Sequence, residues 1–167
     1  MLVKRTVLEA AGGLDAIHSA IIDDCALARL LKPEGRIWLG LTERAKSIRP
    51  YSDINEIRNM VTRSAYAQLN YSVLFLVGTV IGMLLVFAVA PLLAIFASGT
   101  ARLEGVAAWA LMTLAYLPML RFYRLSPLWG LALPVTAALY TLFTVESAVQ
   151  FWRGRGGMWK GRSQAIA

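Results

Sequence analysis

The amino-acid sequence predicts an α-helical membrane protein with a small α/β segment at its amino terminus and two to three transmembrane or re-entrant helices. Of its 167 residues, 57% are hydrophobic, and the mean hydropathy is +0.56. Apolar residues make up about 45–50% of an ordinary soluble domain, even with glycine included. The excess lies after residue 70, where Ser72–Ala97 is uncharged. This run is longer than the roughly 20 residues that cross the hydrocarbon core of a bilayer.

The charged residues are unevenly distributed. Residues 1–70 contain ten Lys/Arg and eight Asp/Glu, whereas residues 71–167 contain seven and two. A basic excess beside apolar runs indicates contact with anionic lipid headgroups and a cytoplasmic position for the basic segments. The basic residues flank the apolar runs and do not form a patch interleaved with aromatic side chains, so the sequence argues against nucleic-acid binding.

Cysteine and histidine are rare. The single Cys25 excludes an intramolecular disulfide, and no Cys/His cluster is present to bind a metal within this chain. The lone His18 is expected to be a surface or packing residue. The chain also lacks a signal-peptide pattern, because Met1–Arg5 leads directly into a helical pattern.

The polar first third has a mixed α/β pattern. Met1–Arg5 and Arg36–Leu41 have strand composition, and Thr6–Ala11 is expected to be helical, with a capping box at its start. Gly12 and Gly13 then permit positive φ and a close backbone approach, although an ordinary helix C-cap is the simpler explanation. The order strand, helix, Gly-Gly, helix, strand is too short for a complete α/β domain.

An acidic pair opens the second predicted helix, Ile21–Lys32. Asp23 and Asp24 precede its apolar face, and Gly35 ends it. A carboxylate at a helix amino terminus lies near free N–H groups and the positive end of the macrodipole, which keeps it ionised. The pair therefore has two explanations: one aspartate caps the helix, or a rigidly held carboxylate serves as a general base.

Residues 53–70 have an amphipathic pattern. A capping box of Asp53 and Glu56 starts it, and apolar residues then recur at helical spacing beside arginines. A basic amphipathic helix directly before a span typically lies in the membrane interface, with its apolar face toward the acyl chains. Tyr66 and Gln68 near its end are placed to reach a headgroup or a phosphate, unless the segment is a simple interfacial linker.

Three apolar runs follow, at Ser72–Ala97, Gly105–Leu120 and Leu128–Val145. Gly78 and Gly82 in the first run form a small-xxx-small pattern that suits packing against another helix. A basic turn separates the second run from the third, and a basic, aromatic tail follows the third.

The positive-inside rule puts residues 1–70, the turn Arg121–Pro127 and the tail on the cytoplasmic side. Three full crossings would separate the amino-terminal part from the tail. Either one run re-enters the membrane, the run with Pro134 being the first candidate, or the tail breaks the rule. The patterns divide the chain into a polar segment, an amphipathic interfacial helix, the membrane runs and a basic cytoplasmic tail: residues 1–52, 53–70, 71–151 and 152–167.

Two stretches are distinctive when they follow the Gly-Gly turn, the acidic helix and the amphipathic helix in this order: Arg121-Phe122-Tyr123-Arg124-Leu125-Ser126-Pro127-Leu128-Trp129-Gly130 and Arg153-Gly154-Arg155-Gly156-Gly157-Met158-Trp159-Lys160-Gly161-Arg162. The combination resembles the carboxyl-terminal half of family-two membrane glycosyltransferases of the GT-A fold, close to the ceramide glucosyltransferase type. The bacterial hopene-associated glycosyltransferase family is the nearest resemblance, and it covers essentially the whole chain. It implies that residues 1–52 are a remnant of a GT-A-like catalytic domain.

The resemblance implies roles for the residues of the first segment. Asp24, with Asp23 beside it, matches the base that deprotonates the acceptor hydroxyl. Gly12 and Gly13 match the backbone turn that lines the sugar and acceptor site.

The resemblance also implies roles for the later segments. The amphipathic helix matches a segment that carries a Gln/Arg-x-x-Arg-Trp motif in the wider family; Arg63-Ser64-Ala65-Tyr66-Ala67-Gln68 stands in its place. Arg63, Tyr66 and Gln68 are therefore the substrate-binding candidates of this helix. The tail resembles a cytosolic Trp-x-Gly-Arg element near the active site, which makes Trp152, Arg153 and Arg155 candidates and favours the re-entrant topology.

Such enzymes bind the nucleotide sugar and a divalent metal, Mg or Mn, through an amino-terminal half with an Asp-x-Asp motif. No Asp-x-Asp occurs in the 167 residues. We therefore expect no cofactor within this chain. We also expect the chain to be a truncated frame, half of a split enzyme or a fragment, which needs a complementing amino-terminal half.

The expected function is sugar transfer, with inversion, from a nucleotide sugar to a lipid hydroxyl. The resemblance implies a hopanoid acceptor and a position in the bacterial inner membrane, with the amino-terminal part and the tail in the cytoplasm. The alternative is a non-catalytic small membrane protein that binds lipids or partners. A transporter component is disfavoured, because the apolar runs lack charges along a pathway and only Glu146 lies near the end of one.

Overall fold

The computed structural model describes residues 2–18, 20–38, 40–44, 53–156, 158–159 and 162–163. In this part of the chain helices predominate, and the only strands are two short ones in the tail. Three helical segments are long and apolar enough to cross a membrane: Val73–Phe96, Gly99–Phe122 and Pro127–Trp152. The predicted α-helical membrane protein is thereby confirmed.

The amino-terminal part consists of short helices: α1 (Arg5–Ala10), η1 (Asp15–Ile17), α2 (Asp23–Leu31) and η2 (Lys32–Glu34). The predicted strands at Met1–Arg5 and Arg36–Leu41 are wrong wherever the structure describes these residues, because Arg5 already belongs to α1 and residues 36–38 and 40–41 form no strand. Met1 and Leu39 lie outside the described residues. A strand needs a neighbour for its backbone hydrogen bonds, and the described part places none beside these stretches.

Helix α1 also starts differently from the prediction. Its N-cap residue is Lys4, which makes no side-chain cap, and Thr6 lies inside the helix. The predicted Thr6–Glu9 capping box is therefore wrong. The Glu9 carboxylate instead accepts a hydrogen bond from Nε of Arg5 at 2.7 Å, an (i, i+4) ion pair of the kind that stabilises exposed helices.

Helix α3 (Ile54–Gln68) is the predicted amphipathic helix. Asp53 caps it, because its carboxylate accepts a hydrogen bond from the backbone N–H of Asn55 at 3.3 Å. Hydrogen bonds from the side chain and the backbone of Asn55 lower the pKa of Asp53.

The packing of α3 buries polar residues as well as apolar ones. Thr62 and Tyr66 are buried where α3 packs on α7, whereas Ile54 and Met60 of the apolar stripe are exposed. Ile54, at the start of the apolar stripe, is thus exposed on the outside of α3, as is typical of a helix that lies in a membrane interface.

The membrane part contains α4 (Val73–Met83), a π-helical stretch η3 (Leu84–Ala88), α5 (Val89–Phe96), α6 (Gly99–Phe122), η4 (Pro127–Ala132) and α7 (Leu133–Trp152). In the tail, β1 (Met158–Trp159) pairs antiparallel with β2 (Arg162–Ser163). Pro134 lies at the start of α7, where proline is favoured because the first N–H groups of a helix have no intrahelical partner.

Gly105 sets the distance between α5 and α6. A Cβ atom at this position would lie 2.6 Å from the backbone nitrogen of Ala94 and 2.8 Å from the carbonyl oxygen of Ala90, so only glycine permits this approach. The predicted packing pair behaves differently: at Gly78 and Gly82 no atom of the described residues lies within 4 Å of such a Cβ. No helix of the described part packs on these two glycines.

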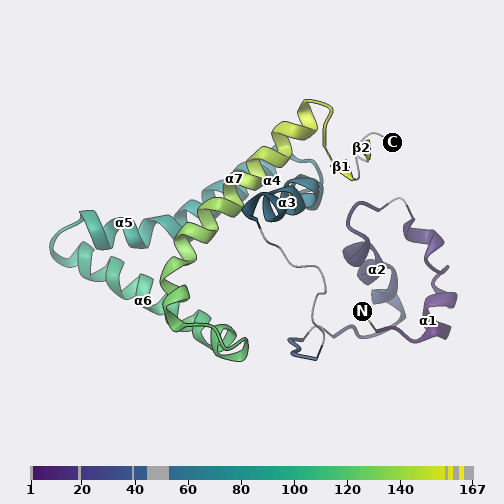
Figure 1. Ribbon diagram of the computed structural model, residues 1–167, viewed down its shortest axis with the longest axis horizontal. Helices are drawn as coiled ribbons and strands as arrows, with labels where there is room; N and C mark the ends of the chain where they lie inside the picture. Colours follow the sequence, from purple (N-terminus) through teal and green to yellow (C-terminus); the bar gives the residue numbers. More distant parts are fainter. Residues whose placement is uncertain are drawn as a thin grey trace.

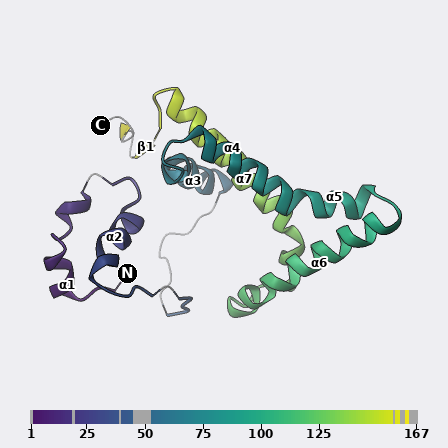
Figure 2. The same cartoon turned by 180° about the vertical axis from the view of Figure 1, so that it is seen from behind.

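Figures 1 and 2 show how the elements are arranged along the long axis of the molecule. The turn between α5 and α6 lies at one end. Helix α3, the start of α4 and the end of α7 lie together nearer the other end, and α1 and α2 lie beyond α3.

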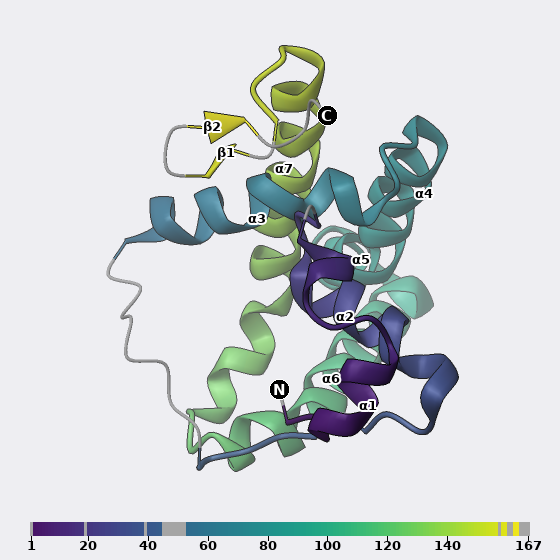
Figure 3. The ribbon, with the colours of Figure 1, turned by 90° about the vertical axis from the view of Figure 1, so that its right-hand side faces the viewer.

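The chain reverses direction after α6. Gly130 in η4 packs against Thr113 in the middle of α6, where the Thr113 hydroxyl lies 3.3 Å from the carbonyl oxygen of Gly130. Helix α7 then runs along η3 and α4 back to α3 (Figure 3). The chain therefore runs back along α6 only as far as Thr113 before α7 turns toward α3.

Candidate functional site

Tyr66 is the centre of the junction between α3, the start of α4 and the end of α7. Only 1% of its surface is exposed. Its hydroxyl donates to the carbonyl of Tyr71 at 2.7 Å, and its ring makes edge contacts with Tyr71, Phe151 and Trp152 at centroid distances of 5.7, 5.5 and 5.8 Å. Tyr71 in turn stacks on Phe151 at 4.5 Å, and burial raises the pKa of Tyr71. Three elements are thus held together by one aromatic cluster.

Ser147 connects α7 to the backbone of α3. Its hydroxyl donates to the carbonyl of Thr62 at 2.6 Å and accepts a hydrogen bond from the N–H of Tyr66 at 3.1 Å. These two backbone groups are the i and i+4 partners of an α-helix, so the hydroxyl bonds to both ends of one turn of α3. Ser147 and Thr62 are buried, and Ala148 is fully buried beside them. Small side chains on α7 thus allow the two backbones to approach closely.

A second polar contact holds α3 to α7 near Arg58. The guanidinium donates through Nε to Oε2 of Glu146 at 2.7 Å and through a terminal nitrogen to Oε1. Gln150 donates to the same Oε1 at 3.0 Å. Both carboxylate oxygens are therefore paired in the bidentate geometry that arginine favours, and this hydrogen bonding raises the pKa of Arg58. The charge of Glu146, directly after the third apolar run, is thus neutralised by Arg58 of α3.

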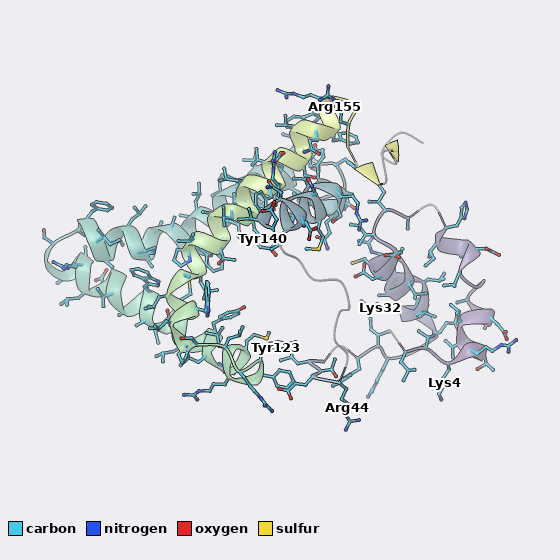
Figure 4. All side chains as sticks on the ribbon, viewed as in Figure 1. Lys4, Lys32, Arg44, Tyr123, Tyr140 and Arg155 are labelled. Atoms are coloured by element: carbon cyan, nitrogen blue, oxygen red, sulfur yellow. The ribbon has the colours of Figure 1, made fainter. Side chains whose placement is uncertain are left out.

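The tail candidates lie at the free end of α7. Trp152, Arg153 and Arg155 are exposed, and Figure 4 shows Arg155 at the outer end of the helix. The hairpin of β1 and β2 lies next to α3 in Figures 1 and 3. Gly157, Lys160 and Gly161 of the distinctive tail stretch lie outside the described residues.

The candidates on α3 separate into two kinds. Arg63 is half-buried and Gln68 is exposed at the end of the helix. The Tyr66 hydroxyl, for which the sequence suggested a headgroup or phosphate contact, is engaged with the Tyr71 carbonyl inside the protein. The structure therefore brings Arg63 and Gln68 to the same end of the molecule as the tail candidates and gives Tyr66 a packing role.

The acidic pair forms the exposed first turn of α2. The N-cap residue is Ile22, so neither aspartate occupies the cap position. Oδ1 of Asp23 accepts from the N–H of Asp24 at 3.0 Å, and Oδ1 of Asp24 accepts from the N–H of Cys25 at 2.7 Å. Both carboxylates thus serve free N–H groups of the first turn. Neither bonds to α3 or α7 anywhere in the described residues, so the structure does not join the acidic pair to the other candidates.

Gly12 and Gly13 end α1 with φ values of 95° and 72°. These left-handed conformations favour glycine, as the sequence predicted. A Cβ atom at Gly12 would make an ordinary contact with Ala16, and one at Gly13 would meet no described atom within 4 Å. Among the described residues, the positive φ values therefore explain this glycine pair, and no close approach by another segment does.

The described residues do not fit a divalent metal. No three His, Cys, Asp or Glu side chains among them come together as metal ligands. Asp23 and Asp24 are adjacent carboxylates whose Oδ1 atoms already accept backbone hydrogen bonds.

A family model described as glycosyl transferase family 21 matches residues 1–166. The chain belongs to glycosyl transferase family 21. This match confirms the resemblance to ceramide glucosyltransferase-like enzymes, while the hopene-associated subgroup is a finer assignment that it does not reach. No curated protein and no solved structure matched the chain.

Sequence reasoning missed Ser147 and the partner of Glu146. One signal was available for the ion pair: an acidic residue in an apolar run is expected to have a cationic partner, and Arg58 lies on the helix before the first run. No comparable signal exists for Ser147, because a serine in a helix usually bonds to its own backbone.

Proposed function

We propose that this chain is the acceptor-side and membrane part of an inverting glycosyltransferase that transfers a sugar from a nucleotide sugar to a lipid hydroxyl, with a hopanoid as the acceptor class. The observation that carries the proposal is the family match over residues 1–166. The three apolar helices and the partly lipid-facing α3 support a lipid acceptor, since a site beside such elements is within reach of a molecule dissolved in the bilayer.

Asp24 is the proposed general base. The acceptor oxygen forms a bond to the anomeric carbon of the sugar while the bond from that carbon to the nucleotide diphosphate breaks. The bonding electrons leave with the diphosphate, and the hydroxyl proton passes to the Asp24 carboxylate. Attack from the face opposite the leaving group inverts the anomeric carbon, which requires the base on that face. Asp24 is exposed and carries no ion pair within the described residues, so its carboxylate is accessible; Asp23 adjoins it.

The cationic and amide side chains at the α3–α7 end are the proposed contacts of the diphosphate: Arg63, Gln68, Arg153 and Arg155. Arginine suits this role because its planar fork can bind phosphate oxygens in pairs. Trp152, which is 55% exposed, offers an aromatic face for the sugar or the lipid. Gly12 and Gly13 line the sugar and acceptor side.

The donor site is proposed to lie outside these 167 residues. The support is that the sequence contains no Asp-x-Asp and that the described residues contain no metal-ligating cluster. A complementing amino-terminal half would bring the nucleotide sugar and a Mg or Mn ion.

The proposed location is the bacterial inner membrane, with two full crossings and one re-entrant segment. Val73–Phe96 and Gly99–Phe122 cross, and Pro127–Trp152 enters and returns. Three contacts support this path. Glu43 of the amino-terminal part lies 3.9 Å from Arg124, which follows the second span. The contact between Thr113 and Gly130 holds η4 beside the middle of α6, and the end of α7 contacts α3. Thr113 lies roughly 13 Å from the end of α6 at 1.5 Å per residue, about half of the hydrocarbon core. The amino-terminal part, the basic turn and the tail then share the cytoplasmic side, as the positive-inside rule requires.

The test is sugar transfer with a complementing donor half supplied. Asp24→Asn keeps the size of the side chain and its capacity to accept the Cys25 N–H, but it removes the base. We expect transfer to fall by at least 10²-fold, within the range that general base catalysis contributes, while nucleotide-sugar binding stays unchanged. Asp23→Asn is the matched control and should retain more activity.

Two results would contradict the proposal. Full transfer by Asp24→Asn would remove Asp24 as the base. Absence of transfer with every donor half, together with retained lipid binding, would favour the non-catalytic alternative.

A further inference from the structure

Four helices in the described part of the chain end in the same backbone motif. After the C-cap, one residue adopts a left-handed conformation, and the N–H of the next residue donates to the carbonyl five residues earlier. Glycine adopts this conformation freely and asparagine tolerates it, whereas other residues adopt it at a conformational cost. The left-handed residues at the ends of α1, α3, α6 and α7 are Gly12, Asn70, Arg124 and Gly154. Arg124, with φ of 55°, is the exception among them.

The fold itself does not need an arginine at this position. The motif is made by backbone bonds, Arg124 N–H to the Arg121 carbonyl at 3.1 Å and Leu125 N–H to the Leu120 carbonyl at 2.9 Å, which glycine would form equally well. The Arg124 side chain is 86% exposed, and its one ion-pair partner among the described residues is Glu43 at 3.9 Å. An exposed pair at this separation contributes little. A residue held in an unfavourable conformation without a strong partner points to a ligand.

The side chains around Arg124 suit the headgroup layer of a membrane. Arg121, in the last turn of α6, is exposed, and its side chain forms no hydrogen bond or ion pair within the described residues. Large aromatic and apolar side chains are exposed in the same turn: Tyr123, Leu125, Leu128 and Trp129. Figure 4 shows Tyr123 at the end of α6, with Arg44 of the amino-terminal segment nearby. Arginines beside aromatic residues at the end of a span are typical of the layer where anionic headgroups meet acyl chains.

We propose that this segment, Arg121–Trp129, is a binding site for the headgroup of an anionic phospholipid. Its phosphate binds Arg121 and Arg124, and its acyl chains lie along the exposed leucines and Trp129. The site does not depend on the transferase reaction, because it uses none of the residues assigned to it. The competing explanation is that the two arginines only complement the negative end of the α6 dipole.

The experiment compares lipid-dependent thermal stabilisation of the full chain in neutral detergent micelles. Phosphatidylglycerol, phosphatidylcholine and soluble glycerol phosphate are titrated in three separate series. The apparent affinity is taken from the rise in Tm, because a ligand that binds the folded state stabilises it. For Arg124→Gly we expect Tm without lipid to rise by about 2–4 °C, because glycine adopts the left-handed conformation without the cost that arginine bears. The apparent affinity for phosphatidylglycerol should fall about fivefold, as expected for the loss of one arginine near an anionic surface.

Three further variants make the result specific. Arg121→Gln should weaken phosphatidylglycerol binding about fivefold as well, and it leaves the left-handed position untouched. Arg124→Lys should retain most of the affinity, because it keeps the charge. Arg102→Ala removes an exposed arginine at the opposite end of α6 and should leave the affinity unchanged.

Three results would overturn the proposal. The first is unchanged phosphatidylglycerol binding in both Arg124→Gly and Arg121→Gln. The second is a lower Tm of Arg124→Gly without lipid, which would show that the arginine serves the fold. The third is equal stabilisation by phosphatidylcholine or by soluble glycerol phosphate, which would show that the turn does not recognise an anionic lipid.

Discussion

At position 147 a serine hydroxyl of α7 bonds to two backbone groups in one turn of α3. It donates to the Thr62 carbonyl and accepts from the Tyr66 N–H. A buried hydroxyl with both capacities satisfied fixes the register of α3 on α7 as well as their distance. Because Tyr66 also contacts Tyr71 and Phe151, the hydroxyl of Ser147 helps to fix the position of α3 on α7.

Replacing Ser147 tests this role. In Ser147→Ala we expect a loss of about 1 kcal/mol, because the hydrogen bonds between the helices are lost while the Thr62 carbonyl and the Tyr66 N–H remain i and i+4 partners within α3. That loss should lower Tm in detergent by about 2–4 °C. Ser147→Val should cost more, about 1–3 kcal/mol, because added methyl groups crowd the helix contact.

Thr144→Ala is the control for Ser147. The Thr144 hydroxyl donates to the Tyr140 carbonyl within its own helix at 2.8 Å, so its removal should leave the contact between α3 and α7 intact. Equal effects of Ser147→Ala and Thr144→Ala on Tm would show that the Ser147 hydroxyl does not hold α3.

At the scale of elements, two pairs of helices are held by different physics. Helices α3 and α7 meet through polar groups, namely the Ser147 bridge and the Arg58–Glu146 pair. Helices α5 and α6 meet through small residues, with Gly105 against Ala90 and Ala94. In a bilayer, lipid tails are as apolar as side chains, so close backbone packing and hydrogen bonds replace the hydrophobic effect as the source of association.

Two glycine substitutions distinguish packing from helix propensity. Gly105→Ala should destabilise the α5–α6 hairpin by about 1–3 kcal/mol, because the new methyl group meets backbone atoms that cannot move aside. Gly78→Ala should be neutral or should stabilise by up to about 1 kcal/mol, because alanine is the better helix former and its methyl group meets nothing. Thermal unfolding of both variants in detergent measures the difference, and a loss at Gly78 as large as at Gly105 would show that another helix packs there.

At the scale of the whole molecule, the arrangement offers a solution to the conflict between charge and span number. Three apolar runs and three basic segments cannot all obey the positive-inside rule if every run crosses. In the structure the end of α7 lies at α3, beside the start of α4. The start of the first run and the end of the third run thus lie at the same end of the molecule. This arrangement is expected when the chain crosses the membrane an even number of times.

Cysteine labelling from each side of the membrane tests the re-entrant path. Single cysteines at Ser98, Ser126 and Ser163 are introduced into a Cys25→Ser background and treated with a membrane-impermeant reagent in oriented vesicles. The unmutated chain, whose single cysteine is Cys25, is labelled in parallel as the reference for the amino-terminal side. We expect Ser126 and Ser163 to label from the side of Cys25, and Ser98 to label from the opposite side. Labelling of Ser163 from the side of Ser98 would show three full crossings.

The membrane class, the amphipathic helix at residues 53–70 and its Asp53 cap followed from local patterns of the sequence. Apolar length and helical spacing are properties of consecutive residues, so Ser72–Ala97 and residues 53–70 could be interpreted without knowledge of their neighbours. The strands predicted at Met1–Arg5 and Arg36–Leu41 failed for the converse reason, since a strand exists only with a partner that the segment itself does not contain.

The candidate site divides in the same way. The family motifs named Asp24, Arg63 and the tail residues, and whether they act together on substrate stays a prediction. The sequence by itself determined that this is an α-helical membrane protein with basic segments beside its apolar runs, because hydropathy and charge are properties of the individual side chains and do not depend on tertiary contacts. Only the tertiary structure decided that Tyr66 is buried, that Glu146 pairs with Arg58 and that the end of α7 returns to α3, because each depends on contacts between residues more than 80 positions or several helices apart.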